Sequence, residues 1–426
     1  MSGIMDMNPI NVSKETHVDV VIIGGGAAGF FAALNLAELN PELSIHIFEA
    51  AREPLNKVRI SGGGRCNVTH ACFDPELLVD FYPRGHRELL GPFYQFGPQQ
   101  TIEWFGRHGV ALKTEADGRM FPVSNRSETI LDCFFKGLGK HGIRLSCSTR
   151  VLDFNWSETD LHWNIKTPNE FYRAKYLVIA TGSDSRCWER LKQLGHEIIE
   201  PVPSLFTFNI KDRNLNALMG LSVPNAQVTI TNSRLQASGP LLITHWGLSG
   251  PAILKLSAWG ARELARQKYC FDIQVNWTGL EESEIKTAVD EMRKTSANKK
   301  IMANPLFQIP QRLWKFLVLR AGIDESHNWS ACPLKLQNEL LVQLHRSRFA
   351  VQGKSTFKDE FVTAGGVSLR EIRFQSFSSK KYSHLYLAGE VLDIDALTGG
   401  FNFQAAWTGG FLIAKDIAAR ESHRNK

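Results

Sequence analysis

A strand, a cluster of glycines, a helix and an acidic residue follow one another in the first 50 residues, and this order limits what the chain can fold into. Residues 18–23 form a short apolar, β-branched run that is typical of a buried parallel strand. Gly24, Gly26 and Gly29 then spell G-x-G-x-x-G at the start of a helix-period segment, residues 27–39. In such a turn the first glycine permits the tight bend, the second lets a pyrophosphate approach the backbone, and the third lets the helix pack close to the strand.

An acidic residue follows at the distance that this turn requires. A second apolar run, residues 44–48, ends in Glu49, about 20 residues beyond the last glycine. A carboxylate in this place accepts hydrogen bonds from a ribose 2′-OH and repels a 2′-phosphate. A glycine-rich turn in an ordinary α/β domain is the alternative. Because strand, glycines, helix and acid all fall in register, the sequence predicts a site for an adenine dinucleotide.

The composition fits a folded chain of two or three domains. Of its 426 residues, 43% are apolar and 22% are charged, values close to those of globular proteins. The net charge of +6 has no block of like charge, and two bound phosphates would explain part of it, so we expect no nucleic-acid partner. Residues 1–14 lack the apolar core of a signal peptide, and no apolar run reaches the ~18 residues of a membrane helix. We therefore expect a cytoplasmic protein without a membrane partner.

The cysteines do not suggest a metal or disulfide framework. There are seven, an odd number, with no C-x-x-C and no histidines at zinc-ligand spacing. They stand at positions 66, 72, 133, 147, 187, 270 and 332. We expect reduced thiols, several of them buried, and no metal site.

Two further glycine clusters have different interpretations. SGGGRCN, residues 61–67, has no strand before it, so it predicts a loop that lies against something flat, with Arg65, Cys66 and Asn67 suited to the edge of a polar ring. A structural loop with a salt-bridged arginine is the alternative.

GLGKHG, residues 137–142, also matches G-x-G-x-x-G, but it follows a helix and precedes a strand. That order predicts a helix C-cap and no phosphate site.

The C-terminal part of the chain repeats the features of the first motif. The strand at residues 176–180 ends in the small residues Ala180, Thr181 and Gly182, which could close the dinucleotide site. Another short strand, residues 385–388, ends in Gly389 and Glu390, and glycines at 399–400 precede a final helix predicted at 404–419. The two ends of the chain are therefore expected to share one site.

The middle of the chain has another character. From Pro201 onward, short alternating runs separated by Pro and Asn predict antiparallel strands in a small sheet or barrel. Residues 281–322 and 333–346 are mainly amphipathic and predict a helical insert.

These motifs together resemble one family. SGGGRCN, GPLLITHWGLSGPAIL (239–254), TAGGVSLREI (363–372) and LAGEVLDIDALTGGFNFQ (387–404) are similar to the BaiN/YhiN-type flavoproteins, bacterial FAD-dependent oxidoreductases. The resemblance implies an α/β fold: a Rossmann-like FAD-binding domain from both termini (1–197 and 354–426), a β-barrel-like domain (198–278 and 334–353) and a small helical insert (279–333). The chain departs from the family after Gly182, where Ser183-Asp184-Ser185-Arg186 replaces a longer Gly/Pro-rich loop that borders the substrate side.

The patterns and the resemblance predict the residues that hold FAD. Glu390 and Asp393 suit ribityl hydroxyls or a water-bridged phosphate, and Lys57 suits the pyrophosphate, although Lys57 could equally be an exposed loop lysine. The N-terminus of the final helix suits the negative charge that reduction leaves on the flavin. The expected cofactor-binding residues are Gly24, Gly26, Ala28, Gly29, Glu49, Ala50, Lys57, Val58, Ser61, Gly63, Arg65, Asn67, Val151, Ala180, Thr181, Gly182, Gly389, Glu390, Asp393, Gly400, Phe401 and Asn402.

The expected activity is that of an FAD-dependent oxidoreductase acting on a small molecule. NAD(P)H or an organic substrate would reduce the flavin, with NAD(P)H as a transient donor that has no Rossmann site of its own, and a second substrate or oxygen would reoxidise it. His245, on a glycine-flanked turn, is the candidate proton donor or acceptor, with a structural histidine as the alternative. A non-catalytic flavoprotein and a nicotinamide-only dehydrogenase also stay open.

Overall fold

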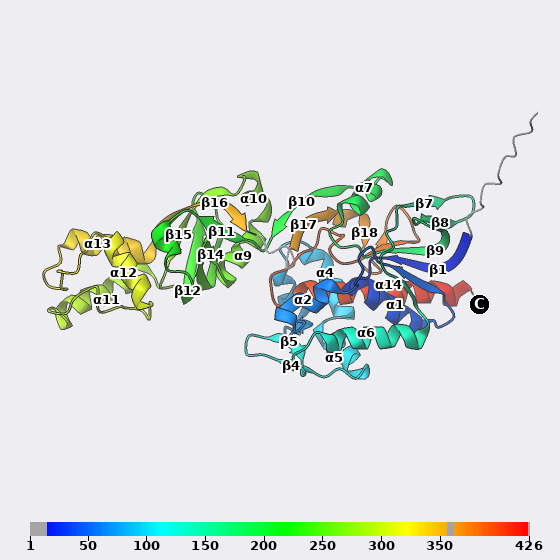
Figure 1. Cartoon of the computed structure of the whole chain (residues 1–426), viewed down its shortest axis with the longest axis horizontal. Helices are drawn as coiled ribbons and strands as arrows, with labels where there is room; N and C mark the ends of the chain where they lie inside the picture. The colour runs from blue at the N-terminus through cyan, green and yellow to red at the C-terminus, as the bar shows by residue number, and fades with distance from the viewer. Residues whose placement is uncertain (1–14, 356–361, 425–426) are drawn as a thin grey trace, which may run out of the picture. The chain divides into compact units, whose positions relative to one another are not determined.

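The computed structural model describes residues 15–355 and 362–424, which form two compact units (Figure 1). Unit 1 contains the chain up to Glu200 and again from Gly365, and unit 2 is Pro201–Ala364. The units therefore divide at 200/201 and 364/365, where the sequence predicted 197/198 and 353/354. The chain leaves unit 1 along β10 (Ile198–Ser204) and returns along β17 (Val362–Val367), and these two strands pair. Residues 1–14, on which the signal-peptide argument rests, and 356–361 lie outside the described residues.

A mixed sheet, with parallel strands in its middle and antiparallel strands joined to them, forms the centre of unit 1. Its order is β18-β19-β20-β9-β1-β2-β6, and the hairpin of β7 and β8 joins it through β9. β1 lies between β2 and β9, parallel to both, and Val20, Val21 and Ile22 of β1 are fully buried, as the apolar run predicted. The strands are β1 (Glu15–Ile23), β2 (Ile45–Phe48), β6 (Arg144–Ser146), β7 (Asp153–Ser157), β8 (His162–Lys166), β9 (Phe171–Ile179), β18 (Ile372–Arg373), β19 (Ser378–Ser379) and β20 (Leu385–Leu387).

The first and last helices of the chain cross closely in unit 1. α14 (Phe401–Arg424) packs on α1 (Ala27–Leu39), the red and dark blue helices of Figure 1. A methyl group added at Gly410 of α14 would lie 2.9 Å from the carbonyl oxygen of Ala28 in α1, so only glycine permits this approach. The first and last helices of the chain are thus brought together. α14 begins at Phe401, three residues before Gln404, where the sequence predicted its start.

The remaining elements of unit 1 surround this helix pair. A three-stranded sheet of order β3-β5-β4 lies beside α14, and Gly142 ends α6 in the left-handed conformation (φ +65°), which confirms the predicted C-cap. Two of the helices begin at glycines, since Gly85 is the N-cap of α4 and Gly97 is the N-cap of α5. The elements are α2 (Asn56–Gly64), β3 (Thr69–His70), α3 (Pro75–Leu78), η1 (Val79–Phe81), α4 (His86–Gln95), α5 (Pro98–Arg107), β4 (Leu112–Thr114), β5 (Arg119–Pro122), α6 (Glu128–His141), α7 (Ser185–Gln193) and η2 (Leu369–Glu371).

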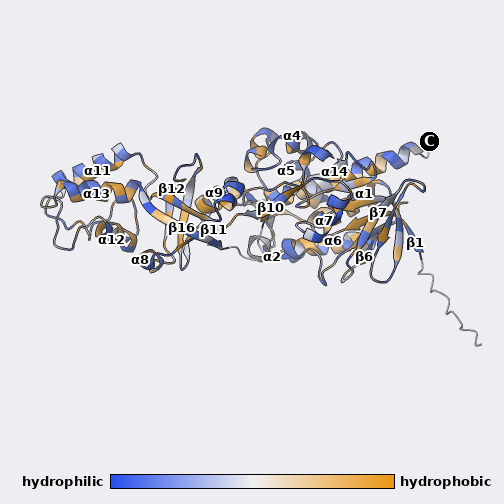
Figure 2. Ribbon diagram, turned by 90° about the horizontal axis from the view of Figure 1, so that it is seen from above, coloured by the Kyte–Doolittle hydropathy of each residue, from blue (hydrophilic) through white to orange (hydrophobic). Residues whose placement is uncertain are grey.

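Unit 2 is built on a closed barrel. Its six strands follow the order β11-β14-β13-β12-β15-β16, all paired antiparallel, which agrees with the alternating runs of the sequence. Apolar residues are concentrated along these strands (Figure 2). The strands are β11 (Thr207–Ile210), β12 (Ser222–Ile230), β13 (Gln236–Thr244), β14 (Gly247–Ser249), β15 (Cys270–Asn276) and β16 (Ser347–Ser355).

Helices complete unit 2. α13 packs against β15, β16, α11 and α12, with Trp277, Trp314 and Trp329 fully buried, so the helical group extends to His345 and the barrel resumes at β16. The helices are α8 (Arg213–Asn216), α9 (Pro251–Trp259), α10 (Ala261–Arg266), α11 (Glu282–Thr295), α12 (Gln311–Arg320) and α13 (Leu334–His345). In residues 15–355 and 362–424, no helix has the length and hydropathy of a membrane span.

Candidate functional site

The turn between β1 and α1 has the shape that a pyrophosphate needs. Gly24 has φ +111°, and a methyl group there would lie 2.3 Å from the carbonyl oxygen of Ala180. A methyl group at Gly29 would lie 2.1 Å from the carbonyl oxygen of Gly24. In contrast, a methyl group at Gly26 would meet nothing within 4 Å, and no side chain caps the helix that begins at Ala27. The backbone is therefore open at the position where the motif places phosphate, with the helix N–H groups behind it.

Glu49 is fixed beside this turn. Its carboxylate accepts hydrogen bonds from the backbone N–H groups of Gly25 (2.7 Å) and Ala51 (2.6 Å). Each carboxylate oxygen can accept a second hydrogen bond, so the side chain is oriented and still able to bind ribose hydroxyls. The predicted role of Glu49 fits this geometry.

A cavity of about 160 Å³ opens next to Glu49. Gly24, Ala50, Val151 and Thr181 line it, so the predicted residues at the ends of β1, β2 and β9 lie around one hollow. Ala180 supplies the carbonyl group that faces Gly24, and Gly182 has φ +63°. This is the edge at which open α/β sheets bind nucleotides.

The segment that departs from the family pattern belongs to this cavity. Asp184 caps α7 by accepting a hydrogen bond from the N–H of Arg186 (3.0 Å), and it pairs with Arg150 at 2.9 Å. Asp184, Arg186 and Arg150 line the cavity with Glu49. Asp184 and Arg186 thus lie on the same side as Glu49, because the turn after β9 leads directly into α7. Arg150 and Arg190 also line the cavity, and neither was predicted, because no local pattern marks them as site residues.

The SGGGRCN segment ends α2 in an unusual conformation. Gly62, Gly63 and Gly64 all have positive φ, and methyl groups at Gly63 and Gly64 would meet nothing within 4 Å. Ser61 accepts a hydrogen bond from the N–H of Cys66 through its carbonyl oxygen (3.0 Å), which closes the loop. Val58 is buried in α2, so only its backbone could reach a ligand. This loop offers open backbone on one side, as the prediction of a flat neighbour requires.

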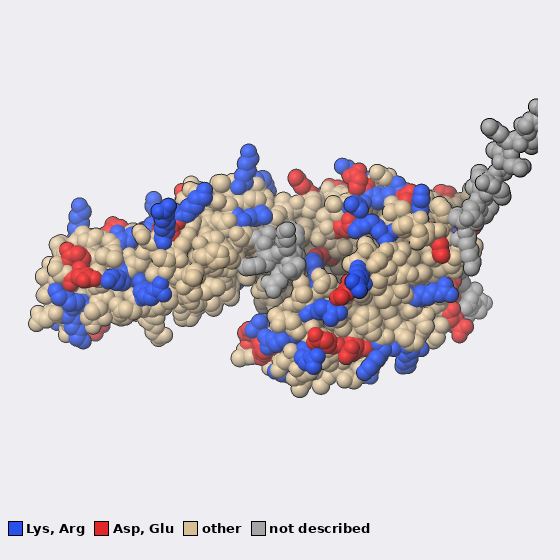
Figure 3. Space-filling view, viewed as in Figure 1, with Lys and Arg blue, Asp and Glu red and all other residues tan. Residues whose placement is uncertain are grey.

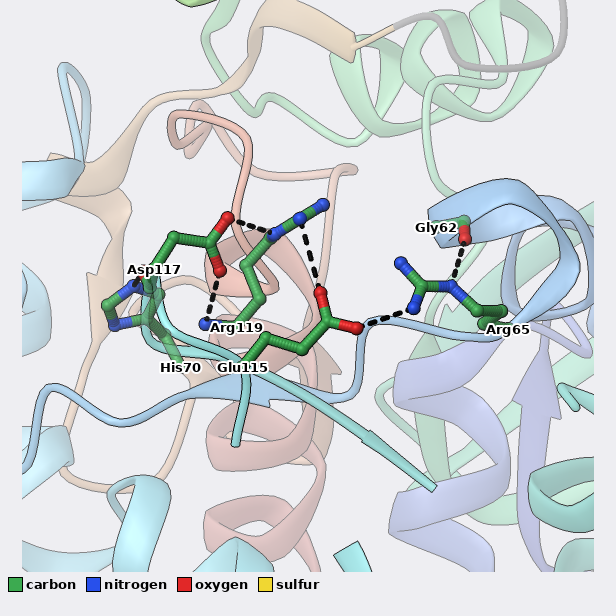
Figure 4. A network of polar contacts seen from close by, with 6 residues as sticks. All are labelled: Gly62, Arg65, His70, Glu115, Asp117 and Arg119. Atoms are coloured by element: carbon green, nitrogen blue, oxygen red, sulfur yellow. Dashed lines mark hydrogen bonds and ion pairs between the residues drawn. The ribbon is translucent and has the colours of Figure 1, made fainter. Parts of the chain in front are cut away.

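Arg65 is held by a network of charges (Figure 4). Its guanidinium donates to Glu115 at 2.6 Å and lies 3.9 Å from the centre of the Phe121 ring. Arg119 bridges Glu115 (3.3 Å) and Asp117 (2.7 Å). The salt-bridged arginine of the alternative interpretation is thus present, and it fixes the cation directly beside the open glycines.

Cys66 is not a reactive thiol in this structure. It is fully buried, and burial raises the pKa of its thiol to about 12. All seven cysteines are free, and Cys133, Cys187 and Cys332 are buried as well. Among the described residues, no group of three or more His, Cys, Asp or Glu side chains could hold a metal ion.

Asn67 connects the SGGGRCN loop to the start of α14. In the amide orientation that gives both the oxygen and the nitrogen a hydrogen-bond partner, the oxygen accepts from the N–H of Gly400 (3.0 Å) and the nitrogen donates to the carbonyl oxygen of Thr69 (3.1 Å). A methyl group at Gly400 would lie 2.6 Å from that same carbonyl oxygen. The N-terminus of α14 is therefore fixed beside the loop, as the sequence predicted for the two ends of the chain.

Phe401 and Asn402 take structural positions in this region. The Phe401 ring is buried and stacks on Phe81 (4.1 Å between ring centres) and His70 (4.6 Å). Asn402 accepts from the N–H of Ala396 (2.9 Å) and donates to its carbonyl oxygen (3.2 Å). The side chains of these two predicted residues thus hold the loop before α14, and only their backbone could face a ligand.

The segment after β20 reaches the first motif. Gly389 has φ +78°, and a methyl group there would lie 3.4 Å from the Cβ of Ala28 in the first turn of α1. Glu390 pairs with Lys57 at 2.5 Å, so the two predicted residues meet although 333 positions separate them. Asp393 is mostly buried, and its N–H donates to the carbonyl oxygen of Val367.

The sequence did not predict the buried polar contacts that hold this arrangement. Arg84 forms a bidentate ion pair with Asp395, both largely buried. Gln404 accepts hydrogen bonds from Thr69 (2.6 Å) and Thr101 (3.0 Å). No local pattern marks such pairs, because the partners lie about 300 residues apart.

His245 lies in unit 2, whereas all the predicted cofactor-binding residues lie in unit 1. It occupies the exposed turn between β13 and β14, and its ring packs edge-on against Trp246. No hydrogen bond from another described residue holds its imidazole.

The chain is similar to known proteins over most of its length. The HI0933-like protein Rossmann domain matches residues 18–416. Ribosomal RNA dihydrouridine synthase of Escherichia coli is 26% identical over 95% of the chain and 99% of that protein, and 3-dehydro-bile acid delta(4,6)-reductase of Clostridium scindens is 25% identical over 94% and 98%. The structure of 3-ketosteroid-delta4-(5alpha)-dehydrogenase from Rhodococcus jostii superposes with a TM-score of 0.52 at 13% identity, over 95% of the chain and 98% of that protein, which shows a shared fold. The chain belongs to the HI0933-like family, whose Rossmann-domain model spans most of its length.

Proposed function

We propose that this protein is an FAD-dependent reductase that adds a hydride and a proton to a carbon–carbon double bond conjugated with a carbonyl group, with NAD(P)H as the reductant. Both relatives match nearly end to end, and their names describe this same chemistry. Dihydrouridine is uridine with the ring double bond next to a carbonyl reduced. A delta(4,6)-reductase acting on a 3-dehydro compound reduces double bonds conjugated with the 3-oxo group.

The residues of unit 1 would hold FAD in the following way. The open backbone at Gly26 and the start of α1 would bind the pyrophosphate, and Glu49 would bind ribose hydroxyls. The Gly63 backbone and the N-terminus of α14 near Gly400 would lie against the polar part of the flavin. When bound there, FAD would supply the hydride-transfer chemistry between a reduced donor and the substrate. The observation that carries the proposal is the open Gly26 turn beside a fixed Glu49.

The geometry favours a flavoenzyme over a nicotinamide-only dehydrogenase. A nicotinamide enzyme has no use for a second glycine-and-acid segment, yet Gly389 lies against Ala28 and Glu390 pairs with Lys57 beside the first motif. The remaining alternative is a flavoprotein that binds FAD without catalysing a reaction. The product analysis described below distinguishes it from an enzyme.

We also propose His245 as the proton donor. Its exposed position without a fixing hydrogen bond suits a group that transfers protons better than it suits a structural histidine. His245→Ala should then slow product formation at least about tenfold, within the range that general acids contribute, while leaving reduction of the flavin by NAD(P)H unchanged. Equal loss in both steps would contradict this role.

Product analysis tests the proposed function. The holoprotein is incubated with NADPH or NADH and either a 4-en-3-one steroid or a uridine-containing ribosomal RNA fragment, and products are analysed by mass spectrometry. The expected product is heavier by two hydrogens and forms only with holoprotein. Oxidation of NAD(P)H by oxygen with neither compound reduced would contradict the proposal.

A further inference from the structure

The positive charge of this protein lies in one unit. Residues 201–364 contain 20 Lys and Arg but 13 Asp and Glu, whereas the rest of the chain contains 29 and 30. Unit 2 thus has a net charge of +7 and unit 1 a net charge of −1. The excess of Lys and Arg over Asp and Glu is therefore concentrated in one unit, although the sequence contains no block of like charge. This unit is the one without the dinucleotide motif. A bound dinucleotide therefore does not explain the excess, and such a positive surface favours association with another anionic partner.

Part of this charge forms a stripe with an exposed aromatic residue. Lys255, Trp259, Arg262 and Arg266 follow one another at spacings of four, three and four residues along α9 and α10. Lys255 and Trp259 lie one turn apart on α9, and Arg262 and Arg266 lie one turn apart on α10, which begins after the cap residue Gly260. Ile253, Leu256 and Leu264 of the same two helices are buried in the barrel core. We call Lys255, Trp259, Arg262 and Arg266 the α9–α10 stripe. A solvated helix face ordinarily carries polar side chains, but this one also carries a large aromatic side chain, Trp259, which is 44% exposed.

Further cations lie around the stripe. Arg234 is exposed on the turn between β12 and β13. The next residue, Leu235, packs closely against Gly260 between α9 and α10, since a methyl group built on Gly260 would lie 2.8 Å from its Cδ1. Lys268 is exposed after α10, and the ammonium of Lys354 lies 5.0 Å from the Tyr269 ring centre. Figure 3 shows Lys and Arg side chains over the region that Figure 1 labels α10 and β16, with few acidic side chains among them.

We propose that the α9–α10 stripe binds single-stranded RNA, with Lys255 and Arg266 at phosphates and Trp259 stacked on a base. The proposal rests on the proposed function, for which it selects a substrate class: a reducible base carried in an RNA. Cationic side chains interleaved with an exposed aromatic ring are the combination that single-stranded nucleic acids bind. The apolar face of α9 and α10 is already packed on the barrel, so the stripe offers a membrane one aromatic residue and no apolar face.

Binding of a fluorescein-labelled single-stranded RNA of about 20 nucleotides, long enough to span a typical single-strand site, tests this proposal. The holoprotein is compared with Lys255→Glu/Arg266→Glu and with Trp259→Ala. The control is Lys286→Glu/Lys294→Glu, which changes two exposed lysines of α11 in the same unit by the same charge. Circular dichroism and flavin content establish that each variant is folded.

The stripe variants should lose affinity in two different ways. Lys255→Glu/Arg266→Glu should bind RNA at least tenfold more weakly and with a salt slope shallower by about 1.4, since each phosphate contact on a single strand contributes ~0.7. Trp259→Ala should bind several-fold more weakly with the slope unchanged, because stacking releases no counterions, and Trp259→Phe should restore most of the loss. The α11 control should bind like the parent protein.

Three results would overturn the proposal: no RNA binding by the parent protein, equal weakening in the stripe and control variants, or preference for anionic phosphatidylglycerol vesicles over RNA. Flavin reduction by NAD(P)H is measured in the same variants and should not change. A parent protein whose reduced flavin is reoxidised by neither a free 4-en-3-one nor a uridine-containing RNA would contradict the proposed function, whichever way the RNA-binding measurement turns out.

Discussion

The carboxylate of Glu49 accepts a hydrogen bond from the backbone N–H of Gly25 at 2.7 Å. This contact joins the end of β2 to the glycine turn after β1, so the residue expected at the ribose also fixes the loop expected at the pyrophosphate. A change at Glu49 should therefore affect the affinity for FAD through both groups.

Glu49→Gln should weaken FAD binding by about tenfold to a hundredfold. The amide has one acceptor oxygen where the carboxylate has two, so either Gly25 or Ala51 loses a charge-assisted hydrogen bond of ~1.5–3 kcal/mol. Equilibrium dialysis of the apoprotein with FAD measures this. Glu53→Gln, which alters an exposed neighbour, is the control and should bind FAD normally. Equal affinities of the two variants would contradict the role of Glu49.

Gly26 and Gly29 of the first motif should respond differently to substitution. Gly26→Val should give folded apoprotein, because its side chain enters open space where the phosphate must lie. Gly29→Ala should instead lower the melting temperature of the apoprotein itself, since its methyl group would lie 2.1 Å from a carbonyl oxygen. Full flavin content in Gly26→Val would refute the assignment of this turn. The parent protein should release FAD and not FMN on denaturation.

The second G-x-G-x-x-G, residues 137–142, should have no part in nicotinamide binding. Gly139 lies inside α6, where a methyl group would meet nothing within 4 Å, so Gly139→Val should fold. Reduction of the flavin by NAD(P)H should proceed at the parent rate and saturate only at high micromolar concentration or above, since this donor lacks a helix-terminus phosphate contact. A tight nicotinamide complex abolished by Gly139→Val would show that the motif binds the donor.

Cys66 should be inert. Burial raises its pKa to about 12, so the folded state keeps the proton that the unfolded state loses near the ordinary value of 9.0. The contribution of this shift to stability is therefore complete below pH 9 and is lost as the pH rises toward 12. At pH 8 iodoacetamide should label exposed Cys270 and spare Cys66. Cys66→Ser should retain most of the flavin reduction rate; loss by several orders of magnitude with FAD bound would reveal a redox thiol.

The sequence predicted those parts of the site that depend on neighbours in the chain. The Gly24–Gly29 turn, the C-cap at Gly142 and the alternating strands of the barrel each follow from local patterns, and the structure has all three. Glu49 could be placed because a fixed number of residues separates it from the turn.

Contacts between distant segments could not be predicted in the same way. The Lys57–Glu390 and Arg84–Asp395 pairs join residues more than 300 positions apart, and no periodicity marks either partner. Phe401 was expected at the cofactor because it follows two glycines, but its ring fills the stack with Phe81 and His70. Tertiary packing decided these side chains, and the net charge of unit 2 became visible only once the units were defined.

Anaerobic reoxidation of the flavin tests the central claim most directly. The holoprotein is reduced with NADPH or dithionite without oxygen, then mixed with a 4-en-3-one steroid or a uridine-containing RNA while the visible flavin absorbance is followed. A reductase of conjugated double bonds should regain the oxidised spectrum in step with formation of the saturated product. A flavin that stays reduced with both compounds and is reoxidised only when oxygen is admitted would contradict the account.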